Sequence, residues 1–219
     1  MHGLASLGCG EEAVIAEFGR MTAMVLQQYA MRRGKKRWID KTPNYYRLLP
    51  LVDRMFAEDI LFIHLVRHPL DSVASLCEAQ PFNVPSPADP DVAAARILYG
   101  GDPTGWAQYW LSVNSLISQF LAARPSRNHC VRYEDLVGDP ETVLRTLFDF
   151  MGEELPDDLV SRALSDDHSP GFEDWKIRRT SGIHTRSVGR SQEWPTPLRE
   201  RLWSSVQPLA ASLGYTLEP

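Results

Sequence analysis

The sequence predicts an α/β fold of three layers with a mainly parallel sheet. The run Ile60–Val66 is nearly all apolar, and His129–Tyr133 also suits a strand; amphipathic helical patterns precede, separate and follow these two stretches. The 219 residues are 43% hydrophobic and 23% charged, an ordinary globular composition with enough apolar material for one sizeable core. A single domain over residues 1–219 is therefore expected.

The composition also excludes several function classes. The formal charge of −5 argues against a general nucleic-acid or membrane-surface binder, so any anion site must be local. Cys9, Cys77 and Cys130 form neither a CxxC pair nor a disulfide framework, which favours buried thiols in a reducing compartment. No apolar run approaches the roughly 20 residues of a membrane span, and the first residues lack the order of a secretory leader. A cytoplasmic protein is expected.

The N-terminal quarter predicts two helices joined by a short strand. Apolar residues recur at helical spacing over Glu11–Met31. Residues 36–39 are expected to form a strand that enters the tetrapeptide DKTP at 40–43, and a helix follows over residues 44–56.

The central stretch, Asp59–Ser75, joins a strand, a tight turn and a helix. Its strand is short, nearly all apolar and rich in β-branched residues, as expected for burial on both faces. Arg67 ends the strand, and Pro69 suits the first turn of a helix that carries Ser72 and Ser75. Ligands of open α/β sheets bind at the carboxyl ends of strands, where unpaired helix N–H groups favour an anion. We expect Arg67 and Ser75 to lie beside such a site.

The remaining elements are mostly helices and loops. Five prolines within residues 80–104 indicate a long loop, interrupted by a helical turn near Val92–Leu98, of the kind that forms lids or binding loops. Asp139 is expected to cap a helix that begins at Pro140 and ends before Gly152. Other helices are predicted over residues 105–123, 157–164 and from 196 to a stop at 214, with a long polar segment over 165–194.

Four segments in this order carry a resemblance. They are WIDKTP (38–43), HLVRHPLDSVAS (64–75), VRYEDLVGDPE (131–141) and SVGRSQEW (187–194). Together they resemble the sulfotransferases that use 3′-phosphoadenosine 5′-phosphosulfate (PAPS), which implies a fold like that of the P-loop nucleotide hydrolases. The sequence motifs DKTP and LVRHP look most like those of sulfotransferase domains embedded in, or acting beside, polyketide and nonribosomal peptide assembly lines.

The resemblance implies that Arg67 and Ser75 hold the 3′-phosphate of the cofactor. A guanidinium offers a planar fork of donors that matches phosphate oxygens, and the serine hydroxyl adds a neutral donor. The alternative for Arg67 is a surface ion pair with Asp71, a kind of contact that contributes little.

The same resemblance implies that Lys41 contacts the transferring sulfuryl group and the bridging oxygen. Positioning and charge stabilisation supply most of the catalysis of such a transfer, and no metal is required by the residues present. The alternative for Lys41 is a salt bridge or helix cap near Asp40.

Three later residues complete the implied cofactor site. Tyr133 matches the tyrosine that approaches adenine, although a tyrosine at a strand end is commonly part of the core. Gly189 and Arg190 match the loop that closes over the 3′-phosphate. A basic cluster close to them either serves the same anion or is solvated; its members are Arg178, Arg179 and Arg186.

The sequence departs from the family at two places. The phosphate-binding loop, written roughly PRSGTT, is absent from the 219 residues, so the first strand and its loop are expected to be missing. Either the sequence begins downstream of that loop, or the chain is a truncated, inactive relative. Pro43 stands where one branch of the family has a catalytic histidine, and other branches use a glutamate from the region that is absent here. His64 is expected to pack within the central strand and His68 to border the site, and His184 in the late loop is the candidate general base.

The predicted function is sulfuryl transfer from PAPS to an acceptor hydroxyl, with 3′,5′-bisphosphoadenosine (PAP) as product. The acceptor is a small molecule, such as a natural product, or a hydroxyacyl chain on a carrier protein. The alternative is a non-catalytic nucleotide-binding or interaction module of the same fold. A kinase-like enzyme is disfavoured because the sequence offers no Walker lysine and no paired metal-binding acids.

Overall fold

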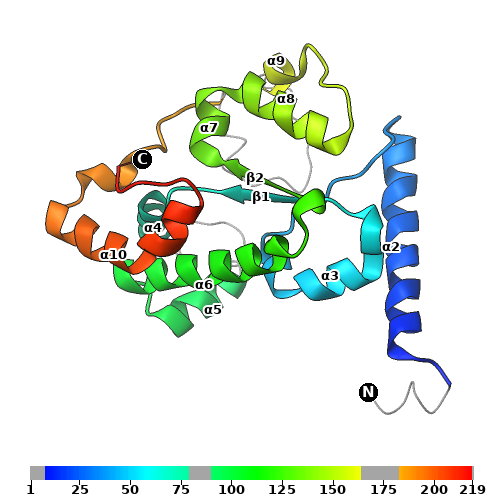
Figure 1. The fold of residues 1–219 in the computed structure, drawn as a ribbon, viewed down its shortest axis with the longest axis horizontal. Helices are drawn as coiled ribbons and strands as arrows, with labels where there is room; N and C mark the ends of the chain where they lie inside the picture. Colours follow the sequence, from blue (N-terminus) through cyan, green and yellow to red (C-terminus); the bar gives the residue numbers. More distant parts are fainter. Residues whose placement is uncertain (1–7, 79–89, 164–182, 219) are drawn as a thin grey trace. The chain divides into compact units, whose positions relative to one another are not determined.

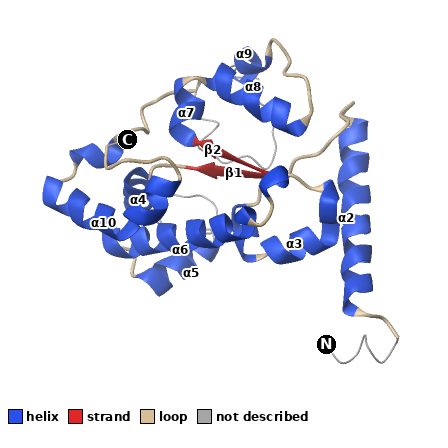
Figure 2. Cartoon of the chain, in the orientation of Figure 1, coloured by secondary structure: helices blue, strands red, loops and turns tan. Residues whose placement is uncertain are grey.

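A computed structural model describes residues 8–78, 90–163 and 183–218 (Figure 1). The described residues include a small sheet in which strands β1 (Phe62–Val66) and β2 (Asn128–Arg132) run parallel (Figure 2). The predicted α/β class is confirmed. None of the described helices is both long and apolar enough to cross a membrane.

The chain divides into two compact units. The first unit is Met1–Phe62 with Leu116–Asn128, and the second unit is Ile63–Ser115 with His129–Pro219. The single domain predicted over residues 1–219 stays a prediction.

The first unit is built on helix α2 (Glu11–Arg32), which confirms the long amphipathic helix predicted there. Helix α2 packs on α3 (Leu49–Phe56), and Gly19 of α2 lies against the backbone of Met55 in α3. A Cβ atom on Gly19 would lie 2.1 Å from the carbonyl oxygen of Met55. The short 3₁₀ segments of this unit are η1 (Pro43–Arg47), η2 (Ala57–Asp59) and η3 (Pro125–Arg127).

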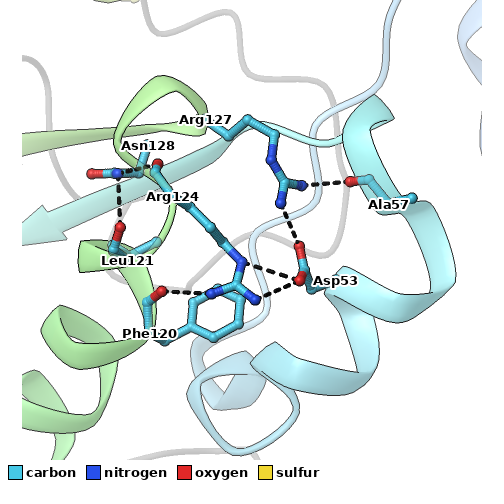
Figure 3. Close-up of polar contacts among 7 residues, drawn as sticks. All are labelled: Asp53, Ala57, Phe120, Leu121, Arg124, Arg127 and Asn128. Atoms are coloured by element: carbon cyan, nitrogen blue, oxygen red, sulfur yellow. Dashed lines mark hydrogen bonds and ion pairs between the residues drawn. The ribbon is translucent and has the colours of Figure 1, made fainter.

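A compact polar cluster joins the end of α3 to the segment after α6 (Figure 3). The carboxylate of Asp53 accepts from Arg124 at 2.6 Å and from Arg127 at 3.0 Å. Arg127 also donates to the carbonyl oxygen of Ala57, and Asn128 donates to that of Leu121. The cluster therefore ties backbone and side chains of the first unit together by directed bonds.

Two predictions in this region are wrong. Residues 36–39 form no strand; the Lys36 carbonyl instead accepts from the side chain of Gln27 on α2, 3.0 Å away. The helix predicted over 44–56 is interrupted at Leu48. Pro50 explains the interruption, because it lacks the N–H that a continuous helix needs and restricts the residue before it.

The second unit holds the rest of the secondary structure. Its helices are α4 (Pro69–Glu78), α5 (Pro90–Tyr99), most of α6 (Pro103–Ala122), α7 (Tyr133–Gly138), α8 (Pro140–Met151), α9 (Leu159–Ala163), the 3₁₀ segment η5 (Arg190–Glu193) and α10 (Thr196–Ser212). Its buried core joins residues of β1, α4, α5, α6 and α10; the largest fully buried side chains are Trp106, Leu70, Leu202, Val73 and Val206.

Most helix predictions of the second unit are confirmed. Pro69 begins α4, and Asp139 caps α8 by accepting from the Thr142 N–H at 3.2 Å. Helix α7 was not predicted, since Tyr133 was expected to end a strand and instead begins a helix.

The prediction that β1 is buried on both faces is wrong, because burial alternates along the strand and Leu65 is 56% exposed. The prediction of buried thiols is also wrong for Cys9 and Cys130, both of which are exposed. Cys130 lies on the outward face of β2.

Two predicted loop regions fall partly outside the described residues. Of the segment 80–104, residues 80–89 lie outside them, whereas α5 and the start of α6 occupy 90–99 and 103–104. Of the polar segment 165–194, residues 165–182 lie outside, including Arg178 and Arg179. The role of 80–104 as a lid or acceptor loop stays a prediction.

Candidate functional site

The site begins at the junction of β1 and α4. Pro69 starts the helix, and the Ser72 N–H donates to the His68 carbonyl at 2.9 Å, which closes the first turn. The His68 ring is fully buried, stacks on Trp203 with centroids 5.7 Å apart, and donates through Nε2 to the Thr216 carbonyl at 2.9 Å. Burial lowers the pKa of His68, which favours the neutral ring. The packing and the hydrogen bond of this ring therefore fix the junction of β1 and α4.

Arg67 stands at the end of the strand with its guanidinium held on two sides. The Cζ atom lies 5.2 Å from the centre of the Tyr133 ring, and Nη2 donates to the Ser187 carbonyl. The Arg67 carbonyl accepts from Trp110 Nε1 at 3.2 Å. The Nε atom of Arg67 is buried and has no hydrogen-bond partner among the described residues. Buried donors without a partner are a small minority in native folds, and such a donor is a candidate for a bond to a water molecule or a ligand.

An open pocket of about 310 Å³ lies beside this guanidinium. Arg67, Ser72 and Ser75 line it together with five residues of α4 and α6: Leu76, Tyr109, Trp110, Val113 and Asn114. The structure thus brings Arg67 and Ser75 to one pocket. Ser72 is a third polar lining residue, placed one helical turn before Ser75 on the same side of α4.

Asn114, which lines the pocket, forms a buried polar pair with His64. Asn114 accepts from His64 Nε2 at 3.0 Å and donates to the Trp110 carbonyl at 2.8 Å. Burial lowers the pKa of His64, which favours the neutral ring, and the side chain is buried within the strand.

Asp71 does not serve as the ion-pair partner of Arg67. It is fully buried, and its carboxylate accepts from the Gly189 N–H at 2.7 Å, the Ser191 N–H at 2.9 Å and Ser191 Oγ at 2.7 Å. The first turn of α4 is therefore tied to a segment 118 to 120 residues further along the chain.

Gly189 and Arg190, expected to close over a phosphate, are engaged with carboxylates of the protein. The Gly189 N–H is bound by Asp71, and its φ of +79° is a conformation that glycine adopts readily. Arg190 forms an ion pair with Glu78 at the last turn of α4.

Sequence reasoning missed Glu134. Its Oε1 accepts from the His68 N–H at 2.8 Å and its Oε2 accepts from the Tyr215 hydroxyl at 2.9 Å. Burial and the neighbouring Glu134 raise the pKa of Tyr215 above its ordinary value. One backbone donor expected to face a ligand anion is thus used by a carboxylate of the protein. Its place directly after Tyr133 in the YED segment was the available signal.

The two candidate catalytic residues lie in different units. Lys41 is exposed in an irregular segment of the first unit, next to Asp40, which accepts from the Thr42 hydroxyl at 3.2 Å and from the Tyr45 hydroxyl. His184 belongs to the second unit and is half-buried, and its Nδ1 has no hydrogen-bond partner among the described residues.

Comparison with known proteins gives one consistent result. The model of a family described as the sulfotransferase family matches residues 8–157. Nodulation protein NoeE of Sinorhizobium fredii is 28% identical over 200 residues, which cover 86% of this chain and 46% of NoeE. The chain thus spans about half the length of this curated relative.

Two solved structures are similar in fold. The sulfotransferase domain of the Synechococcus PCC 7002 olefin synthase superposes with a TM-score of 0.63 at 22% identity, over 89% of this chain and 64% of that one. The sulfotransferase domain from the curacin biosynthetic pathway gives 0.62 at 23% identity, over 89% and 69%. At these identities the likeness shows a shared fold.

Proposed function

Because a family model covers more than half of it, the chain belongs to the sulfotransferase family, and we propose that it transfers a sulfuryl group from PAPS to an acceptor hydroxyl. One observation carries the choice of donor. Arg67 and Ser75 line one pocket, and the Nε donor of Arg67 has no partner among the described residues. A 3′-phosphate supplies the oxygens that this donor lacks.

The pocket chemistry suits a phosphate better than an uncharged group. The guanidinium donates charge-assisted bonds, and the hydroxyls of Ser72 and Ser75 add neutral donors from one side of α4. Each charge-assisted bond contributes about 1.5–3 kcal/mol net, enough to separate a 3′-phosphorylated nucleotide from its unphosphorylated relative. To contact the 3′-phosphate, Gly189 must give up its bond to Asp71, and Arg190 must give up its ion pair with Glu78.

The transfer step assigns roles to two further residues. PAPS supplies an activated sulfuryl group; the bond between sulfur and the bridging oxygen breaks as the acceptor oxygen bonds to sulfur, and PAP leaves. In this proposal the Lys41 ammonium stabilises charge on the bridging oxygen, and His184 accepts the proton of the acceptor hydroxyl. Tyr133 is the residue proposed to face adenine, and residues 1–219 are proposed to form one catalytic domain.

The acceptor proposed is a hydroxyl of a natural product, free or bound to a carrier protein. This follows from the two similar structures, which are sulfotransferase domains of an olefin synthase and of a biosynthetic pathway.

Isothermal titration of the full-length protein with PAP and with AMP tests the donor assignment. PAP should bind at least tenfold more tightly than AMP, and Arg67→Ala should remove most of that advantage while changing the affinity for AMP by less than about twofold. Equal losses for both nucleotides would contradict a 3′-phosphate role. Incubation with sulfur-labelled PAPS and a panel of hydroxylated acceptors then separates an enzyme from a module that only binds.

A further inference from the structure

We propose that Asp71 is a positioning residue for the anion pocket: by holding the segment Ser187–Ser191 it directs the guanidinium of Arg67 toward the pocket. The inference rests on the proposed function, because it concerns the same 3′-phosphate site. It adds a residue that touches no ligand itself and acts through Arg67.

Both carboxylate oxygens of Asp71 accept hydrogen bonds from this segment. Oδ2 accepts from the Gly189 N–H, and Oδ1 accepts from the N–H and the hydroxyl of Ser191. Both Asp71 and Ser191 are fully buried. Buried charge-assisted bonds of this kind are among the stronger ones in a protein, so the segment has little freedom at Gly189–Ser191.

The other end of the same segment orients Arg67. The Ser187 carbonyl, two residues before Gly189, accepts from Nη2 of Arg67, while the ring of Tyr133 lies 5.2 Å from Cζ. The bond from Nη2 and the ring beside Cζ together restrict the orientation of the guanidinium. In that orientation Arg67 lines the pocket with Nε unpartnered among the described residues.

Asp71 and Arg67 therefore hold one five-residue segment from two points of the β1–α4 junction. If the segment shifts, the Ser187 carbonyl moves and Arg67 loses the contact that aims it. A buried carboxylate is a costly choice for packing alone, because it must be desolvated and fully bonded. The bonds that it makes to the segment offset this cost.

Asp71→Asn is the direct test. The amide presents one acceptor and one NH₂ group, so an N–H of the protein that faced a carboxylate oxygen now faces a donor. We expect the ratio of the AMP to the PAP dissociation constant to fall about tenfold or more, with the AMP value changed by less than about twofold. Ser191→Ala removes one of the three bonds and should lower the ratio by about threefold.

A purely structural role is distinguished by a matched control. Val206→Ala removes buried volume from the core of the second unit at a residue outside the segment Ser187–Ser191. It should lower the denaturation midpoint and leave the ratio of the two dissociation constants unchanged. Hydrogen exchange of the Gly189 and Ser191 amides should accelerate in Asp71→Asn and stay protected in Val206→Ala.

The outcomes separate this inference from the proposed function. If the wild-type protein does not distinguish PAP from AMP, the 3′-phosphate assignment fails and the inference fails with it. If the wild type distinguishes them and Asp71→Asn and Ser191→Ala keep the wild-type ratio, the positioning role alone is overturned. Should Asp71→Asn not fold, Ser191→Ala decides the question by itself.

Discussion

The two units of the chain are held together by different kinds of interaction. The second unit buries an apolar core drawn from β1, α4, α5, α6 and α10, with Trp106 and Leu70 at 0% exposure. The described part of the first unit has a smaller buried apolar cluster, formed by Leu49, Phe62 and Leu121. The first unit adds directed polar contacts around Asp53 (Figure 3).

Helix α2 illustrates how little apolar surface the first unit covers. Phe18, Val25 and Tyr29 are 56%, 56% and 59% exposed, while Gly19 and Ala30 are buried on the other side. Apolar burial is non-directional and scales with the area removed from water, whereas ion pairs depend on geometry and on protonation. We therefore expect the second unit to be sensitive to cavities, and the first unit to be sensitive to acid and to changes at single contacts.

The largest effect is expected at Trp106. Its side chain is fully buried and forms edge contacts with the Tyr109 ring, whose centroid is 5.7 Å away. Trp106→Ala should lower the free energy of unfolding by about 3–5 kcal/mol, because it leaves a large cavity. Urea denaturation followed by circular dichroism measures the loss. Trp106→Phe is the control: it keeps a ring and removes the buried Nε1 donor, so its loss should be about 1 kcal/mol. Equal losses for both variants would argue against a cavity term.

A smaller but pH-dependent effect is expected at Asp53. Hydrogen bonds from Arg124, and then from Arg127, hold the pKa of Asp53 below its ordinary value despite partial burial. Asp53→Ala should cost about 1–3 kcal/mol near pH 7, because two partly buried guanidinium groups lose their carboxylate.

The pH dependence of that effect has a definite sign. A carboxyl whose pKa is lowered on folding stabilises the protein above its unfolded value of about 3.9, and this stabilisation is lost as the pH falls through the folded value. Denaturation of wild type and Asp53→Ala at several pH values should show a difference that is constant above about pH 5 and shrinks in acid. A difference independent of pH would show that packing, and not charge, makes the contribution.

The smallest effect is expected where α2 meets α3. Gly19→Ala would normally favour a helix by about 1 kcal/mol, but here the new Cβ meets the Met55 carbonyl oxygen at 2.1 Å. The two helices must move apart, so we expect a net loss of about 1–2 kcal/mol in thermal or urea denaturation. Gly138→Ala in α7, where an added Cβ meets nothing within 4 Å, is the matched control and should be neutral or stabilising.

Local signals in the sequence predicted much of the fold. Helix α2 follows from its apolar periodicity, α8 from the cap at Asp139, and α4 from the proline at its first turn. The pairing of Arg67 with Ser75 at one pocket was also predictable, because one residue ends a strand and the other lies on the helix that follows it at once. Such features depend on neighbours in sequence and are encoded locally.

The contacts between residues far apart in the sequence became known only from the tertiary structure. Residues 36–39 form no strand, and the Lys36 carbonyl instead accepts from the side chain of Gln27. Glu134 and Asp71 acquired their roles from residues 66 to 120 positions away. The sequence by itself determined the α/β class, the family and the β1–α4 junction with Arg67 and Ser75. The tertiary structure determined which donors of Arg67 are used, which carboxylate holds the segment Ser187–Ser191, and which unit depends on charge. The physical reason is that a hydrogen bond is satisfied by whatever the fold places within about 3 Å, and distance along the chain does not reveal that partner.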